Sequence, residues 1–168
     1  MATIDSGVDA EHPDLSDRVH SGLNLVAGED RDWARDPVEH GTHCAGIIAG
    51  SDSGSGIVGI AVDAELDACR VLPGGCFSDL IAALDRCIEQ SIDIAHLAVA
   101  APNTSTLVTR KLLDAYNAGT ACIAPAGDTN NDPVRGPKGS CVLLASRDRT
   151  SYALVAGRPR RQREGHGP

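Results

Sequence analysis

The sequence predicts an α/β fold with three layers, in which helices cover both faces of a doubly wound, mainly parallel sheet. Short aliphatic runs alternate along the chain with amphipathic helical segments, a pattern typical of parallel strands joined by right-handed helical crossovers. Aromatic residues make up only 2% of the 168 residues, so Val, Ile, Leu and Ala must build the core. Aliphatic strands of this kind fit a sheet that is buried on both faces.

The first half of the chain is expected to hold two strands and one helix, separated by loops. The expected elements are a strand over residues 2–4, mainly loop over 8–39, a buried helix over 43–49, a glycine-rich loop over 50–59 and a strand over 68–72. The first strand stops because Asp5, Ser6 and Gly7 are turn-forming residues. The apolar run at 43–49 has no clear period, and we interpret it as a buried helix.

The second half is expected to hold two amphipathic helices and three strands. The expected elements are a helix from Ser78 to about Gln90, a strand over 92–101, a helix that ends at Gly119, and strands over 121–124 and 141–145. Ser78 and Ser105 are the expected N-caps, because a serine side chain can accept a hydrogen bond from a free amide of the first helical turn. Ile81, Leu84 and Ile88 would form the apolar face of the first of these helices.

We expect one domain over residues 1–147, followed by a basic, disordered tail over residues 148–168. From Arg158 onward the tail holds four arginines and no apolar pattern. The basic residues lack the interleaved aromatic side chains that stack on bases, so nucleic acid is not an expected partner. No apolar run is long enough to span a bilayer, and no signal peptide is visible in these 168 residues, so neither a membrane nor a particular compartment is indicated.

The cysteines are expected to be buried free thiols rather than disulfides or metal ligands. The chain contains Cys44, Cys69, Cys76, Cys87, Cys122 and Cys141. None of them form a C-x-x-C pair, and most lie beside small or aliphatic residues. Free cysteine behaves as a small hydrophobic residue and is commonly buried.

Two motifs carry the chemistry, and they occur in a fixed order. The segments concerned are TIDSGVD at residues 3–9, HPDL at 12–15, HGTHCAG at 40–46 and GIVGIA at 56–61. They resemble, over about residues 2–147, the aspartate motif, the histidine motif and the following segment of the subtilase family of serine peptidases. The order of aspartate before histidine is also that of subtilisin.

The resemblance implies a serine-type endopeptidase that acts on polypeptides, with His40 as general base and Asp5 as its partner. A serine hydroxyl is a weak nucleophile until a neighbouring imidazole takes its proton. A buried carboxylate that accepts the Nδ1 proton holds the imidazole in the required tautomer and stabilises the imidazolium. Asp5 could instead serve only as a turn residue. His43 is structural in the family, and secretion is what the resemblance implies for localisation.

The sequence departs from the family pattern in three places. Asp128 stands where subtilases place the asparagine that donates a hydrogen bond to the oxyanion, and an ionised carboxylate cannot donate. The substrate-binding strand usually reads Ser-Leu-Gly, whereas this chain has Ala98, Val99 and Ala100. An extended peptide could still pair with the backbone of this strand, because strand addition uses main-chain groups.

The third departure is the nucleophile, because the motif Gly-Thr-Ser-x-Ala does not occur in these 168 residues. The resemblance therefore implies an incomplete fold and a chain that is inactive by itself. A non-catalytic pseudoprotease that binds peptides is the alternative. A metal-binding protein that uses His40, His43 and Cys44 is a third interpretation, which lacks a distant fourth ligand.

No cofactor is firmly indicated, and calcium follows only from the resemblance. Some subtilases bind calcium through the aspartate of the HPDL segment and the loop after the histidine helix. Asp14 matches the first of these, but Ser53 and Ser55 are poor ligands in the second, because calcium prefers carboxylate and carbonyl oxygens.

Overall fold

A computed structural model describes residues 1–28, 32–99, 105–125 and 152–154 of the chain. Its elements are β1 (Ala2–Asp5), β2 (Val19–Asn24), α1 (His40–Ala49), β3 (Leu66–Arg70), α2 (Phe77–Glu89), β4 (Ile94–Leu97), α3 (Thr106–Ala118), β5 (Ala121–Pro125) and β6 (Tyr152–Leu154). The strands form one sheet in the order β2-β3-β1-β4-β5-β6. All neighbouring strands are parallel except β5 and β6, which are antiparallel.

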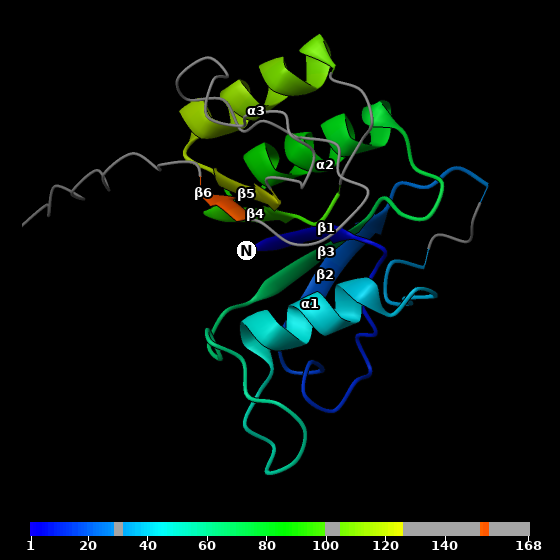
Figure 1. Cartoon of the computed structure of the whole chain (residues 1–168), viewed down its shortest axis with the longest axis vertical. Helices are drawn as coiled ribbons and strands as arrows, with labels where there is room; N and C mark the ends of the chain where they lie inside the picture. The colour runs from blue at the N-terminus through cyan, green and yellow to red at the C-terminus, as the bar shows by residue number, and fades with distance from the viewer. Residues whose placement is uncertain (29–31, 100–104, 126–151, 155–168) are drawn as a thin grey trace, which may run out of the picture.

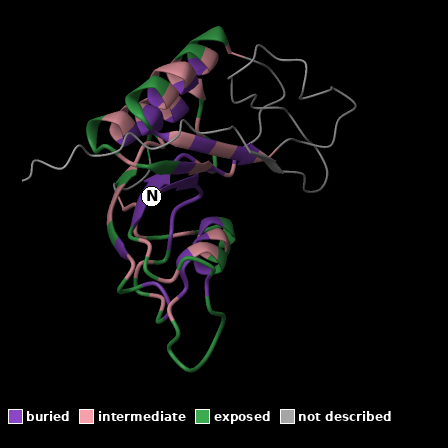
Figure 2. Ribbon diagram, turned by 90° about the vertical axis from the view of Figure 1, so that its left-hand side faces the viewer, coloured by how far each residue is buried: buried purple, intermediate pink, exposed green. Residues whose placement is uncertain are grey.

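Helices cover both faces of the sheet, which confirms the predicted three-layer α/β fold. Helices α2 and α3 lie on one side and α1 on the other (Figures 1 and 2). One apolar cluster joins Ile4 and Leu97 of the central strands to Leu84 of α2 and Leu112 of α3. A second cluster packs α1 against the opposite face of the sheet through residues that include Ala45. No helix in the described part of the chain has the length and apolar character needed to cross a membrane.

The central strands and the helix assignments agree with the sequence prediction, with shifted ends. Strand β4 is shorter than the predicted run over 92–101, and β3 begins two residues earlier than predicted. The predicted strand over 141–145 lies outside the described residues. Ser105 is the N-cap of α3, where its side chain accepts a hydrogen bond from Val108 N–H, and Gly119 ends that helix in the left-handed region at φ 105°.

The N-terminus of α2 differs from the prediction, because Cys76 and not Ser78 is its N-cap. The Asp79 carboxylate accepts the Cys76 N–H at 2.7 Å, and the Cys76 side chain accepts from the Asp79 backbone, which makes a capping box. An aspartate in the first turn also interacts favourably with the positive end of the helix dipole. The buried face of α2 also differs from the predicted one, because Leu84 is fully buried together with Leu80, Ala83 and Cys87, whereas Ile81 and Ile88 are only partly buried.

The two strands at the edges of the described sheet were not expected from the sequence. Strand β2 lies within the region predicted as loop, and it contains Gly22, a residue that weakens strand signals. A Cβ atom at Gly22 would overlap the ring of Trp33, so the glycine makes room for that side chain. Strand β6 lies within residues 148–168, the segment predicted to be a basic, disordered tail, and Tyr152–Leu154 pair antiparallel with β5.

A buried ion pair ties α2 to the sheet. Arg86 donates two hydrogen bonds to the Asp67 carboxylate of β3, from Nε at 2.8 Å and from Nη2 at 2.7 Å. Ser21 Oγ of β2 donates a third at 2.6 Å. Burial by itself raises the pKa of Asp67, but the hydrogen bonds from Arg86 and Ser21 and the Arg86 charge outweigh it, so the pKa lies below its usual value.

The cysteines are mostly, but not all, buried. Cys69, Cys87 and Cys122 are buried, as expected, whereas Cys44 is only half-buried and Cys76 is exposed at the start of α2. Burial is the main cause that raises the pKa of the Cys87 thiol to about 12 and that of Cys69 further still. Both thiols are therefore protonated at neutral pH and serve as packing groups. Cys141 lies outside the described residues.

Candidate active site

Asp5 ends the central strand β1 and points to the face of the sheet that α1 covers. Side chains alternate along a strand, so Asp5 lies on the opposite face from Ile4, which is in the α2–α3 core. The Asp5 side chain is only 1% exposed. The chain turns sharply just after it, where Gly7 adopts φ 110° and a Cβ atom would overlap the Arg35 carbonyl oxygen. The carboxylate is thus fixed at the carboxyl edge of the sheet, where parallel α/β folds place their sites.

His40 is the first residue of α1, and its imidazole meets this carboxylate. Nδ1 of His40 lies 2.9 Å from Asp5 Oδ1 and 3.0 Å from Oδ2. The His40 side chain is 55% exposed, so the Asp5 carboxylate of the pair is buried whereas the His40 imidazole is accessible to solvent. A carboxylate can only accept, so Nδ1 carries the proton and Nε2 is left as the nitrogen that can receive one. This arrangement confirms that the two motif residues come together.

The glycine after His40 allows the helix to approach the strand this closely. A Cβ atom at Gly41 would overlap the Gly7 carbonyl oxygen and would lie 3.1 Å from Asp5 Cβ. Any larger residue would therefore push the start of α1 away from the end of β1. The glycine of the HGTH segment is thus required by packing at the site.

A hydrogen-bond network that the sequence did not reveal surrounds the pair. Asp36, four residues before His40, accepts hydrogen bonds from Ser6 Oγ at 2.8 Å and from both the N–H and the Oγ1 of Thr42 at 2.7 Å. Burial raises the pKa of Asp36, but the hydrogen bonds from Thr42 and Ser6 lower it more, so that the pKa lies below its usual value. The Asp-Pro pair ahead of the helix does indicate a turn at this place, but it does not indicate which groups the Asp36 carboxylate binds.

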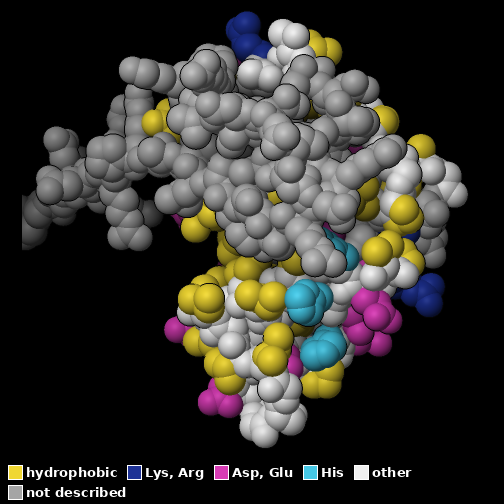
Figure 3. Space-filling view, in the orientation of Figure 1, with side chains coloured by type: hydrophobic (Ala, Val, Ile, Leu, Met, Phe, Trp, Pro, Cys, Tyr) yellow, Lys and Arg dark blue, Asp and Glu magenta, His cyan; other side chains and the backbone are white. Residues whose placement is uncertain are grey.

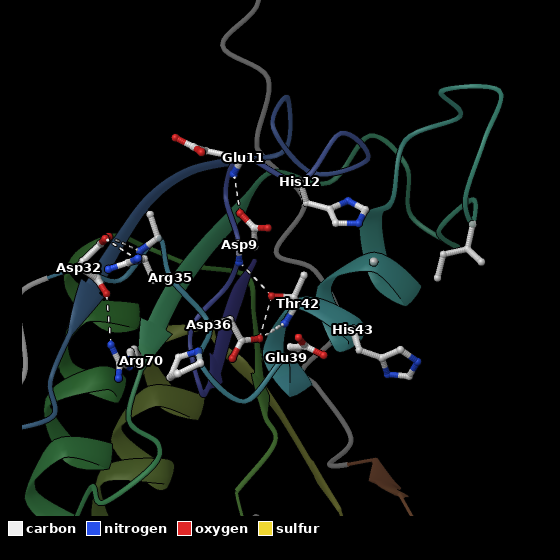
Figure 4. Close-up of a pocket in the computed structure, with 14 residues that line it drawn as sticks. Asp9, Glu11, His12, Asp32, Arg35, Asp36, Glu39, Thr42, His43 and Arg70 are labelled. Carbon is white, nitrogen blue, oxygen red and sulfur yellow. Dashed lines mark hydrogen bonds and ion pairs between the residues drawn. The ribbon is translucent and has the colours of Figure 1, made fainter.

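The metal-binding interpretation does not match the side chains that come together. Within the described residues, the donor atoms that lie within 4.8 Å of one another belong to Asp5, His40 and Cys44, and His43 is not among them. Figure 4 shows His43 pointing away from Asp36 and Thr42. Burial, followed by the charge of Asp5, raises the pKa of Cys44 to about 11, which disfavours the thiolate that binds metals. Asp5 is moreover already engaged by His40.

Of the three residues predicted to bind substrate, Ala98 and Val99 are described by the structure. Ala98 follows β4 directly, and its N–H donates to the Ile4 carbonyl at 3.1 Å, which places it next to the end of β1. Val99 is buried in the α2–α3 core. Ala100 and Asp128 lie outside the described residues. The structure therefore brings Ala98 to the same sheet edge as Asp5.

The residues named for calcium are close together, but they are engaged with one another. Ser53 Oγ donates to Asp14 Oδ1 at 2.6 Å and lies 3.5 Å from Ser55 Oγ. One buried carboxylate with two hydroxyls is a poor donor set for an ion that takes six to eight oxygen ligands, so these residues do not fit a calcium site well. Calcium stays a prediction of the resemblance.

A cavity of about 1180 Å³ is lined mainly by the two loops that precede α1, and its lining includes Thr42 and His43 of α1 but neither Asp5 nor His40. Its lining includes the acidic side chains of Asp9, Glu11, Asp32, Asp36 and Glu39. Figure 4 shows these groups around Thr42, and Figure 3 shows histidine and acidic side chains on one face. His12 also lines the cavity, and its Nδ1 accepts the Asp14 N–H at 3.2 Å. The loops before α1 thus form a hollowed surface that is rich in acidic side chains.

A parallel α/β sheet that carries an Asp–His pair at its carboxyl edge matches the class of serine-type peptidases, in which a histidine activates a hydroxyl nucleophile. Comparison with known proteins identifies the family within this class. A model of the subtilase family matches residues 1–152. The chain belongs to the subtilase family.

Individual relatives agree with this assignment. Subtilisin NAT from Bacillus subtilis subsp. natto is 34% identical, over 92% of this chain and 43% of its own length. The major intracellular serine protease of Bacillus subtilis (strain 168) is 31% identical, over 80% and 44%. Among solved structures, the S41 psychrophilic protease matches with a TM-score of 0.69 and 30% identity over 78% of this chain and 46% of that one. Sphericase matches with a TM-score of 0.67 and 25% identity over 78% and 47%. The chain spans less than half the length of these relatives.

Proposed function

We propose that this chain supplies the acid–base half of a subtilisin-type endopeptidase site, with His40 as the general base and Asp5 as its orienting carboxylate. The observation that carries the proposal is the contact of His40 Nδ1 with both Asp5 oxygens, at 2.9 and 3.0 Å, next to an exposed imidazole. Membership of the subtilase family supports a polypeptide as the substrate.

In this role His40 Nε2 takes the proton of a serine hydroxyl while the oxygen attacks the scissile carbonyl carbon. Asp5 stabilises the imidazolium that results, and the same proton then passes to the leaving amine. The Gly-Thr-Ser-x-Ala motif does not occur in these 168 residues, so this polypeptide by itself lacks the nucleophile. Asp128, at the position that the resemblance assigns to the oxyanion donor, would weaken oxyanion stabilisation further, because a carboxylate only accepts.

The 168-residue polypeptide is therefore expected to cleave neither casein nor peptide esters faster than its His40→Ala variant. In subtilisin, loss of the nucleophilic serine alone lowers turnover by about 10⁶, and the motif that would supply this serine does not occur in these 168 residues. The measurement is the initial hydrolysis rate at matched protein concentration. Turnover that disappears only in His40→Ala would contradict this expectation and would reveal a different nucleophile.

A peptide-binding pseudoprotease is the second candidate, and the missing serine motif together with the Ala98–Val99–Ala100 sequence favours it. Calorimetric titration of the same polypeptide with a tetrapeptide amide that is not cleaved distinguishes the pseudoprotease from the half-site of an endopeptidase. Binding without cleavage supports the second candidate. A polypeptide that binds nothing by itself favours a half-site that functions only together with a serine-bearing partner segment.

A further inference from the structure

We propose that Asp36 is a positioning residue, whose carboxylate holds the first turn of α1 against the Asp5–Ser6 turn and thereby sets the His40 imidazole against Asp5. Its importance for catalysis rests on the proposed function. Its effect on the geometry of the pair does not, and that effect can be measured without any cleavage.

The N-cap of α1 does not carry out the usual capping task. Glu39, the N-cap, adopts φ 64° and makes no side-chain hydrogen bond to the helix. The first amides of a helix have no partner within the helix and must be satisfied from outside. Here the Gly41 N–H donates to Ser6 Oγ at 3.1 Å, and the Thr42 N–H donates to Asp36 Oδ2 at 2.7 Å.

These two acceptors are linked to each other and to the aspartate of the pair. Ser6 Oγ donates to Asp36 Oδ1 at 2.8 Å, and the Ser6 N–H donates to Asp5 Oδ1 at 2.7 Å. A continuous path of hydrogen bonds therefore runs from the Asp5 carboxylate through Ser6 to Asp36 and on to the start of α1. His40, the residue just before the two anchored amides, is held at the far end of this path.

The chemistry of the network requires a carboxylate at position 36. Among the described residues, the hydrogen bonds to its two oxygens all come from donors: Ser6 Oγ and the Val38 N–H at Oδ1, and the N–H and Oγ1 of Thr42 at Oδ2. An asparagine side chain would direct its NH₂ group at one of these donor pairs and could not satisfy it. A negative charge at this place also interacts favourably with the N-terminus of the helix. Asp36 thus has a role that its amide isostere cannot fill.

The test is the tautomer of neutral His40, determined from its ring ¹⁵N shifts at about pH 9, where an ordinary imidazole is uncharged. The wild type is expected to hold the proton on Nδ1, facing Asp5. In Asp36→Asn the population should move toward the Nε2–H form, which an imidazole without a partner at Nδ1 prefers. Because the shift is read in folded molecules only, a loss of stability alone would leave it unchanged.

Asp32→Asn is the matched control, because Asp32 lines the same cavity and its carboxylate interacts with Ala34 and Arg35, which lie before α1. Its carboxylate accepts the Ala34 N–H at 3.0 Å and lies 3.8 Å from Arg35 Nε. This variant should keep the wild-type tautomer. If circular dichroism shows that Asp36→Asn is unfolded, the proposal is tested instead with the variants Thr42→Val and Thr42→Ser. Of these two, only the serine variant retains a hydroxyl that can donate to Asp36. A wild-type tautomer in folded Asp36→Asn, or in Thr42→Val, would overturn the proposal.

Discussion

Replacing Gly41 by alanine should lower the free energy of unfolding by about 3 kcal/mol, the upper end of the range for overpacked cores. The added methyl group would overlap the Gly7 carbonyl oxygen and crowd Asp5. The first contact is with the backbone of the turn after β1 and the second with the last residue of β1, so the start of α1 would have to move away from both. The Asp5–His40 contact should be lost together with the stability. Urea denaturation measures the first effect and the ring ¹⁵N shifts of His40 the second.

Gly46→Ala is the matched control, because it makes the same substitution in the same helix. A Cβ atom at Gly46 would have Ile57 Cδ1 as its nearest neighbour at 3.7 Å, an ordinary contact. Since glycine is a poor helix former, this variant should gain about 0.5–1 kcal/mol. Equal changes in the free energy of unfolding of the two variants would contradict the prediction. They would show that the space between α1 and β1 at Gly41 is large enough for a methyl group.

Replacing Arg86 by methionine should destabilise the protein by about 3 kcal/mol at neutral pH, because it leaves the Asp67 carboxylate buried without its charged partner. Ser21 continues to donate to this carboxylate, which keeps the loss at the lower end of the range for buried pairs. Arg110→Met removes an exposed partner of Asp114 and should cost about 0–1 kcal/mol. Urea denaturation at neutral pH compares the two, and equal losses would contradict the role given to burial.

The same pair predicts a dependence of stability on pH. The pKa of Asp67 is lowered in the folded protein, so the stabilisation is fully present above its unfolded pKa of about 3.9. It should be lost as the pH falls through the lower, folded value. Asp67→Asn cannot titrate at this position, and its unfolding free energy should therefore fall less steeply on acidification. Parallel curves for the wild type and this variant would show that Asp67 does not contribute to the pH dependence.

The parts of the fold that the sequence revealed are those with strong local patterns. The strand before Asp5 and the helix with Ser105 and Gly119 at its ends were recognisable because buried aliphatic runs and caps leave clear signals. The contact of Asp5 with His40 was expected from two motifs in a known order. No local pattern sets the distance between residues 35 positions apart, so only the motifs predicted it.

Most of the features that the sequence missed depend on tertiary contacts. Strand β2 forms by pairing with β3, and its Gly22 leaves space for the Trp33 ring. The composition of the segment indicates neither contact. Cys76 was missed for a local reason, because cysteine is not among the preferred N-cap residues even though Asp79 completes a capping box with it. Asp36 was overlooked because its partners Ser6 and Thr42 come from two other segments. A turn signal such as Asp-Pro does not show which donors the carboxylate will meet.

The role of Asp5 in orienting His40 as a general base is tested most directly by the tautomer of His40 in the wild type and in Asp5→Asn. The ring ¹⁵N shifts are recorded at about pH 9, so that an ordinary imidazole is neutral. We expect a proton on Nδ1 in the wild type, which leaves Nε2 free, and a shift toward the Nε2–H form in Asp5→Asn. A wild-type imidazole in the Nε2–H form, or one unaffected by Asp5→Asn, would contradict this role.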